Sequence, residues 1–385
     1  MNSRERVLTA LAHQEPDRVP IDLGGTAVSS IAIPTYASLR KLLRLPDKPI
    51  ETLELVQQIA RVDDDVLDLF GVDVVPVFAN PPDGYKLAMV DEPGGGQSFK
   101  DEFGATLRRP PACFYYDWRE FPLPEPSLEM LARMDWPNPA DPGRFRGLRD
   151  RVKALRAGTD RALFSVAPCG HDLFNQILRV RGMENGLCDL IGEVEFAEAF
   201  FDRLTETICT AQRLFLAEVG DLIDIHFAAD DLAGQSGPLL SPALYRRIIK
   251  PRQARIMQTI RAGTRAPILY HSCGAVGPFL DDLVELGVQI LNPVQVSAAG
   301  MEPAELKQRY GRKLSFWGGG CDTQQVLPFG TVAEVRAEVR RRIREFAPGG
   351  GFVFNPVHNI QPLVPPANVA ALFEAALEFG RYPIS

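Results

Sequence analysis

The sequence lacks the features that would place the protein in a membrane or outside the cell. Its 385 residues contain no uninterrupted apolar run near the roughly 18–20 residues of a membrane span. The first residues are charged and have no apolar core of the kind found in secretion signals. The six cysteines are few and irregularly spaced, which does not suit a disulfide framework. We therefore expect a cytoplasmic protein with reduced thiols.

The sequence also lacks the positive charge that is typical of nucleic-acid-binding proteins. Its formal net charge is −7 at pH 7, from 42 Lys and Arg against 49 Asp and Glu. One arginine-rich stretch, residues 336–344, alternates with apolar residues and predicts the solvated face of a helix. With 45% hydrophobic and 24% charged residues, the composition indicates a globular protein with a large core.

Apolar runs alternate with helical patterns along most of the chain. Eight of these runs are predicted strands, at residues 18–24, 72–78, 162–168, 222–229, 266–273, 288–293, 313–318 and 351–356. Strands that alternate with helices pair in parallel, and eight such units predict an α/β fold, a closed (β/α)8 TIM barrel. An open doubly wound sheet is the alternative, but no Gly-x-Gly-x-x-Gly pattern follows the first strand.

Three segments add to this repeating pattern. Residues 3–13 predict an N-terminal helical extension, and residues 54–70 predict a further helix from their apolar spacing. Residues 80–127 combine a hairpin-like pattern with many prolines, and we interpret them as an insertion that caps the barrel. The chain is thus expected to form one barrel domain over residues 1–385, with the insertion inside it.

A histidine and a cysteine two residues apart end the fifth predicted strand. His271 and Cys273 project to the same side, because side chains alternate along a strand. An imidazole beside a thiol suits a soft divalent metal, zinc above all. A structural zinc site needs four protein ligands, whereas a catalytic one needs three and keeps a position open.

Other polar residues also gather at strand ends. These are His171, His226, His358, Cys169, Cys321, Asp22, Asp230, Asp231, Gln235, Asn292, Gln295, Asp322, Asn355 and Asn359. In a barrel these positions share one rim, where catalytic groups normally lie, so an enzyme is favoured over a non-catalytic scaffold. His226 lies inside an apolar strand, where a hydrogen-bonded core histidine is as good an interpretation as an active one.

Two residues compete to be the third metal ligand. Cys321 ends the seventh strand and would give a thiolate-rich set, whereas His358 follows the eighth strand and would give a second imidazole. We prefer Cys321 at this point. The remaining alternative is that no metal binds and that Cys273 is simply a thiol of the site.

Several motifs together resemble the uroporphyrinogen decarboxylase superfamily. They lie at residues 4–20, 230–238, 271–274, 291–295, 316–324 and 356–361, so that the resemblance covers nearly the whole chain. It implies the barrel fold, possible dimers, and one of two activities. One is cofactor-free decarboxylation of a porphyrinogen. The other is zinc-dependent methyl transfer between a small molecule and a corrinoid carried by a separate protein.

Two details of the resemblance favour the methyltransferase branch. True decarboxylases carry an Arg-Gln-Ala-Gly-Arg segment after the first strand, and the corresponding residues 23–30 contain no arginine. The methyltransferases use His-x-Cys and a later Cys as zinc ligands, and His271 and Cys273 match the first two. The later Cys of those enzymes falls near the final strand, roughly where this chain has His358.

The leading hypothesis is therefore a zinc-dependent methyltransferase of a corrinoid system. Its expected metal ligands are His271, Cys273 and either Cys321 or His358; its catalytic candidates are Asp231 and His226; and its substrate-binding candidates are Asp230, Gln235, His171, Asn292, Gln295, Trp317 and Asp322. One alternative is a metal-free lyase on a carboxylated molecule, for which Arg179 and Arg181 are the nearest cationic groups. The other is a barrel that only binds a small ligand or a corrinoid.

Overall fold

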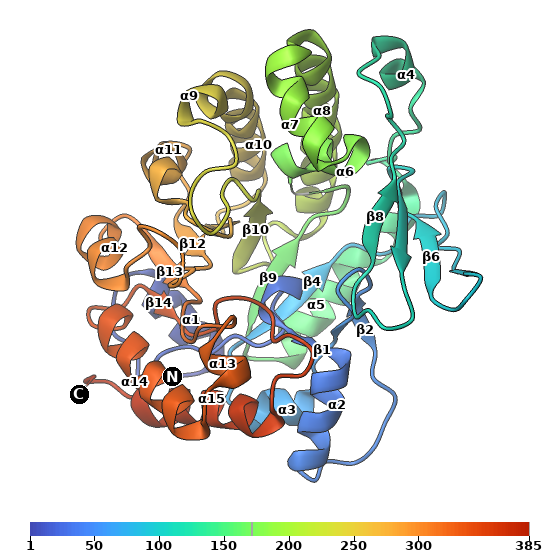
Figure 1. Cartoon of the computed structure of the whole chain (residues 1–385). Helices are drawn as coiled ribbons and strands as arrows, with labels where there is room; N and C mark the ends of the chain where they lie inside the picture. Colours follow the sequence, from blue (N-terminus) through green and yellow to red (C-terminus); the bar gives the residue numbers. More distant parts are fainter. Residues whose placement is uncertain (171, 385) are drawn as a thin grey trace.

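A parallel sheet of seven strands forms the centre of the computed structural model, which describes residues 1–170 and 172–384. The strands lie in chain order around the sheet (Figure 1): β4 (Val74–Phe78), β9 (Ala162–Val166), β10 (Ile225–Ala229), β11 (Ile268–His271), β12 (Ile290–Asn292), β13 (Ser315–Trp317) and β14 (Phe352–Val353). Every neighbouring pair is parallel. Buried Val, Ile, Leu and Phe side chains dominate these strands, as a sheet covered on both faces requires.

Residues 20–22 close the sheet into a barrel. The Phe354 N–H donates to Pro20 O, and the Asp22 N–H donates to Phe354 O, both at 2.8 Å. On the other side the Asp73 N–H donates to Ile21 O at 2.8 Å, just before β4. The first predicted strand therefore lies between β14 and β4, and the predicted (β/α)8 barrel is confirmed.

Helices cover the outside of the barrel. They are α3 (Asp64–Leu69), α5 (Leu148–Gly158), α6 (Phe174–Arg181), α7 (Met183–Gly192), α8 (Val194–Val219), α9 (Pro242–Leu244), α10 (Lys250–Gly263), α11 (Leu280–Glu285), α12 (Pro303–Tyr310), α13 (Val326–Phe329), α14 (Val332–Phe346) and α15 (Pro366–Phe379). None of the described helices has the length and hydropathy of a transmembrane segment. The N-terminal extension is α1 (Ser3–Leu11), which begins with a capping box between Asn2 and Glu5.

The helix expected over residues 54–70 is only partly present. Helix α3 covers its second half. The first half begins at the end of β2 (Thr52–Glu54) and contains β3 (Ile59–Ala60), which pairs with β2 on one side and with β1 (Ile31–Ala32) on the other. The Glu54 carboxylate accepts the N–H groups of Val56 at 2.6 Å and Gln57 at 2.8 Å. These bonds close a tight turn between β2 and β3, because they satisfy backbone donors that a helix would use. Helix α2 (Ile33–Leu42) precedes this small sheet.

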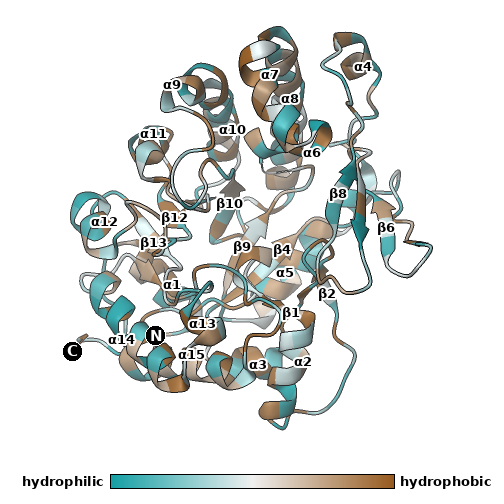
Figure 2. Cartoon of the chain, viewed as in Figure 1, coloured by the Kyte–Doolittle hydropathy of each residue, from teal (hydrophilic) through white to brown (hydrophobic). Residues whose placement is uncertain are grey.

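The insertion forms a separate antiparallel sheet beside the barrel. Its strands are β5 (Val90–Asp91), β6 (Gln97–Lys100), β7 (Thr106–Arg109) and β8 (Asp117–Glu120), followed by α4 (Leu128–Arg133). Phe99, Leu107 and Tyr116 make a small core of its own. Figure 2 shows hydrophobic residues concentrated in barrel strands such as β9, whereas β8 is largely hydrophilic. The Tyr116 N–H donates to Val56 O at 2.9 Å and ties the insertion to the β2–β3 turn.

His226 lies between the barrel and helix α8, away from the rim. The ring is fully buried, with Nδ1 2.8 Å from Ser165 Oγ and Nε2 2.8 Å from Gln212 Oε1. The ring also packs against Phe215 of α8. Both nitrogens are therefore used inside the core, and the expected catalytic role of His226 is not supported by its position. Burial lowers its pKa to about 3.

This burial predicts a pH-dependent contribution to stability. Between about pH 6.5 and pH 3 the unfolded chain binds a proton at His226 that the folded chain does not, so stability falls as the pH falls. The difference in unfolding free energy between wild type and His226→Gln should shrink by about 1.4 kcal/mol per pH unit below 6.5. Denaturant unfolding at several pH values measures it. A constant difference would show that the buried ring accepts the proton.

Candidate metal centre

Three potential metal ligands meet at the mouth of the barrel. His271 is the last residue of β11, Cys273 lies two residues later, and His358 follows β14. One ligand atom from each residue lies within 4.8 Å of the other two. The Cys273 Sγ is 3.4 Å from His271 Nε2, and the two imidazole centroids are 5.8 Å apart. The structure thus brings together both residues of the strand motif and one of the two candidate third ligands.

Amide side chains orient both imidazoles. His271 Nδ1 lies 2.6 Å from Asn292 Oδ1, and His358 Nδ1 lies 2.9 Å from Asn359 Oδ1. An amide oxygen only accepts, so in the neutral imidazole each Nδ1 carries the proton and each Nε2 presents its lone pair. The Asn292 amide is itself fixed, because its Nδ2 donates to Trp317 O at 2.8 Å. This arrangement is typical of metal-binding histidines.

Asp231 stands beside the cluster. Its Oδ1 accepts the Cys273 N–H at 2.7 Å and lies 3.7 Å from His271 Nε2, and its side chain is 44% exposed. Asn175 holds the Asp231 backbone from both sides, with bonds of 2.6 Å to its N–H and 3.1 Å to its carbonyl. Sequence reasoning predicted Asp231 but missed Asn175, which belongs to no motif and lies at the start of α6.

The cluster provides the donors that zinc prefers. Burial lowers the pKa of His358 to about 4, with a smaller effect from His271, so this imidazole is neutral at pH 7. Burial and the neighbouring Asp231 carboxylate raise the pKa of the Cys273 thiol well above its ordinary value. Two imidazoles and one thiol fit zinc, and three protein ligands leave a position open for a substrate.

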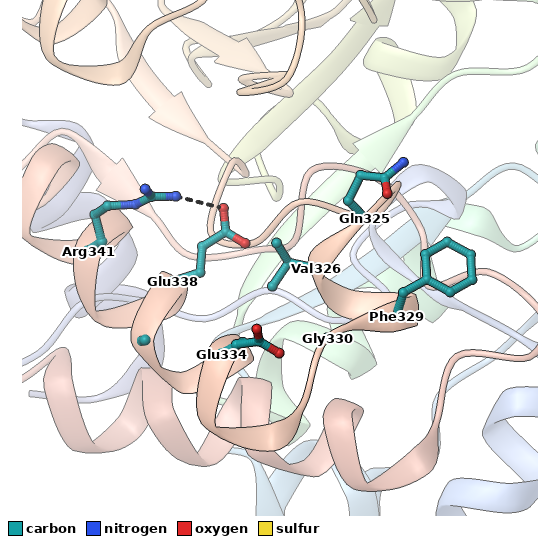
Figure 3. Close-up of a pocket in the computed structure, with 8 residues that line it drawn as sticks. Gln325, Val326, Phe329, Gly330, Glu334, Glu338 and Arg341 are labelled. Atoms are coloured by element: carbon teal, nitrogen blue, oxygen red, sulfur yellow. Dashed lines mark hydrogen bonds and ion pairs between the residues drawn. The ribbon is translucent and has the colours of Figure 1, made fainter.

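Cys321 does not join this cluster. It is fully buried, and its Sγ lies 3.5 Å from Glu338 Oε2 on helix α14, outside the barrel. Figure 3 shows this Glu338 on α14, where it also contacts Arg341. Gly318, with φ +93°, turns the chain after β13, so the thiol points toward α14. The preference for Cys321 as third ligand is therefore reversed in favour of His358.

Glutamines hold the loops around the centre. Gln295 Oε1 accepts the Gly274 N–H at 2.6 Å, and its amide donates to Gln235 Oε1. Gln235 in turn donates to Ser297 O at 2.8 Å. A Cβ at Gly274 would lie 2.5 Å from Gly234 O, so only glycine permits this packing after Cys273. These two glutamines, predicted to bind substrate, are used here for positioning.

The remaining predicted residues have mainly structural contacts. Asp230 is fully buried and accepts the N–H groups of Phe174 and Asn175 at the start of α6, and burial raises its pKa to about 8. Trp317 is buried inside the barrel, where it donates to Asp22 Oδ2 at 2.8 Å. Asp322 accepts the Gln324 N–H at 2.8 Å within its own turn. The predicted His171 lies outside the described residues.

Comparison with known proteins places the chain in a family. The sequence model described as uroporphyrinogen decarboxylase (URO-D) matches residues 120–379. The chain belongs to the uroporphyrinogen decarboxylase family. Among curated members, it is 30% identical over 193 residues to a uroporphyrinogen decarboxylase of Thermus thermophilus, covering 47% of this chain and 49% of that protein. It is 27% identical over 182 residues to the enzyme of Xanthomonas euvesicatoria, covering 43% of this chain and again 49% of that protein.

The chain spans about half the length of these curated family members. Among solved structures, the methyltransferase from Methanosarcina mazei superposes with a TM-score of 0.64 at 18% identity, with 98% of this chain and 99% of that chain covered. This likeness supports the barrel fold along the whole length of the chain.

Single substitutions should separate ligands from neighbours. Substitution of a residue that only hydrogen-bonds to a metal ligand typically lowers metal affinity about 10–100-fold. Removal of a ligand itself, by Cys273→Ala or His358→Ala, should therefore lower zinc affinity at least about 100-fold. Cys321→Ala, a matched removal of a buried thiol, should leave it unchanged. Competition with a chromophoric chelator measures the affinities. If Cys321→Ala lost zinc affinity and His358→Ala did not, Cys321 and not His358 would be the third ligand.

Metal affinity should also rise with pH. The Cys273 thiol is protonated at neutral pH in the free protein, so zinc binding must release that proton. The apparent association constant should increase about tenfold per pH unit from pH 6 to 8, while His358 stays neutral throughout. Cys273→Asp should bind with little pH dependence, because a carboxylate is already ionised in this range. Equal slopes in the two proteins would exclude Cys273 as a ligand.

Proposed function

We propose that the protein is a methyltransferase that moves a methyl group between a small molecule and a corrinoid carried by a partner protein. The observation that carries the proposal is the cluster of His271, Cys273 and His358, which offers three donors and leaves one metal position open. Membership of the family and the similar fold of the Methanosarcina mazei methyltransferase support it.

Zinc held by these three residues would polarise a sulfur or oxygen atom of the small substrate. Asp231 is the group that would take a proton from that atom, because it is half exposed beside the cluster. Asn175 and the Cys273 N–H hold Asp231 in this position. Asn292 and Asn359 keep both imidazoles in the tautomer that presents Nε2.

The insertion would limit access to this centre. The Tyr115 hydroxyl donates to Gln361 Oε1 in the loop that carries His358, and the Gln361 amide contacts Asn359. Asn359 also donates to Gln57 Oε1 at 2.9 Å, in the β2–β3 turn. These contacts would hold the insertion beside the mouth, where it would restrict water and form part of the surface that meets the corrinoid protein.

The curated family members favour a second candidate, decarboxylation of a carboxylated small molecule. That chemistry needs cations to hold carboxylates near the first strand. Residues 23–30 contain no cation, and there Thr26 and Ser29 hydrogen-bond to one another in a short 3₁₀ turn. The methyltransferase interpretation is therefore preferred.

Methyl transfer can be tested with methylcobalamin as donor and 2-mercaptoethanol as acceptor. Zinc-loaded protein should consume methylcobalamin and form the methyl thioether, and chelator-treated protein should not. Asp231→Asn keeps the acceptor for the Cys273 N–H and should lower the rate about 100-fold. Asp322→Asn, a matched change in the loop after β13, should leave the rate unchanged. Absorbance of the corrinoid measures each rate.

Two outcomes would contradict the proposal. Decarboxylation of uroporphyrinogen by chelator-treated protein would support the lyase instead. Binding of methylcobalamin without any methyl transfer, unaffected by His271→Ala and Cys273→Ala, would support a barrel that only binds ligands.

A further inference from the structure

Arg179 reaches the barrel mouth from helix α6. Its Nη1 lies 2.6 Å from Asp172 Oδ2, and Asp172 follows β9 and pairs with Ala229 at the end of β10. On its other side, the guanidinium lies 5.3 Å from the centre of the Trp118 ring on β8. Arg179 therefore occupies the junction between the rim and the insertion.

The charge of Arg179 acts on both sides of this junction. Burial opposes the positive charge of Arg179, but Asp172 and, less strongly, Asp231 raise its pKa above the ordinary value. Burial raises the pKa of Glu54 and of Asp101 in the insertion, and the charge of Arg179 offsets a small part of that rise. Ala229, the bridge partner of Asp172, is itself the register partner of His271, so Asp172 and the Arg179 that it contacts lie on the rim that carries the proposed metal centre.

Arg181, two residues along the same helix, shows what a purely structural arginine looks like here. Its Nε and Nη2 donate to Asp189, and its Nη1 donates to Leu123 O at 2.8 Å. Its side chain is 4% exposed. Three of its five N–H groups are engaged by protein acceptors and the side chain is buried, so it is not accessible to a ligand.

Arg179 differs in each respect. Its side chain is 33% exposed, and Asp172 is the one acceptor that it contacts among residues 1–170 and 172–384. A guanidinium carries five N–H donors, so one edge of the fork is unused. The stack on Trp118 holds the plane of the fork without using its donors.

We propose that Arg179 binds a carboxylate of the small substrate through this unused edge. The inference rests on the proposed function, since the other end of that substrate would reach the open metal position. A planar fork matches a carboxylate with two parallel hydrogen bonds. Asp172 and Asp231 already place negative charge around Arg179, so a single negative charge fits this site better than the double charge of a phosphate.

A matched pair of thiols tests this assignment. 3-Mercaptopropionate and 2-mercaptoethanol share a thiol and a two-carbon chain, and only the first carries a carboxylate. Dissociation constants are measured by tryptophan fluorescence or calorimetry on zinc-loaded and on chelator-treated protein. Wild type should bind 3-mercaptopropionate at least about tenfold more tightly in both states, as expected for a charge-assisted hydrogen bond.

Arg179→Met should abolish this preference and leave the dissociation constant for 2-mercaptoethanol unchanged. Arg179→Lys should keep part of the preference, because it keeps the charge without the fork. Arg119→Met, an exposed arginine on the same strand as Trp118, is the matched control and should keep all of it.

Several results would overturn the assignment. They are a ratio near one in wild type, a ratio that persists in Arg179→Met, no measurable binding of either thiol, or displacement by inorganic phosphate more effective than displacement by propionate. The ratio in chelator-treated protein reports on Arg179 alone. Failure of methyl transfer, by contrast, would appear as no loss of methylcobalamin by the zinc-loaded protein, so the two proposals fail separately.

Discussion

The hydrogen bond between His271 Nδ1 and Asn292 Oδ1 is the interaction on which the candidate centre depends. The parallel register of β11 and β12 places these two residues directly beside each other. Because the amide oxygen can only accept, the bond fixes the tautomer and turns Nε2 toward the mouth. His358 is oriented in the same way by Asn359, within its own loop. The two imidazoles meet only because residues 20–22 close the barrel and hold the end of β14 in place.

Without a cation, the groups of this centre oppose one another electrostatically. Burial keeps the His358 imidazole neutral and the Cys273 thiol protonated, and the Asp231 carboxylate disfavours a thiolate further. A divalent cation would reverse these effects, because it stabilises a thiolate and needs neutral imidazoles. The same carboxylate that disfavours the thiolate in the metal-free protein is then available to a substrate. The electrostatics of these groups therefore favour a metal-binding site over a network held by hydrogen bonds alone.

The barrel and the strand motif were predictable from the sequence, whereas the third ligand was not. Strand and helix periods are local properties, and the two-residue spacing of His271 and Cys273 follows from strand geometry. Cys321 was misjudged because Gly318 and Gly319 have positive φ angles of 93° and 83°, and such a turn can send the next side chain in either direction. The helix over residues 54–70 was misjudged because side-chain bonds from Glu54 outweigh apolar spacing. Asn175 acts on backbone atoms of Asp231 that are distant in sequence, so no local pattern reveals it.

Two pairs of like residues lie near the mouth, Asp230 with Asp231 and Arg179 with Arg181. In each pair one side chain is buried in structural contacts and the other faces the mouth or its edge. Asp230 and Asp231 are adjacent, and adjacent side chains leave a strand end in opposite directions. Asp230 is buried against the start of α6, where backbone N–H groups satisfy it, and Asp231 opens to the mouth. Arg179 and Arg181 are two apart on α6, which places them on nearly opposite faces of that helix. Arg181 is engaged by Asp189, and Arg179 faces the junction with the insertion. The mouth thus receives one half-exposed carboxylate from the first pair, beside the candidate metal centre, and one partly exposed guanidinium from the second pair, at the junction with the insertion.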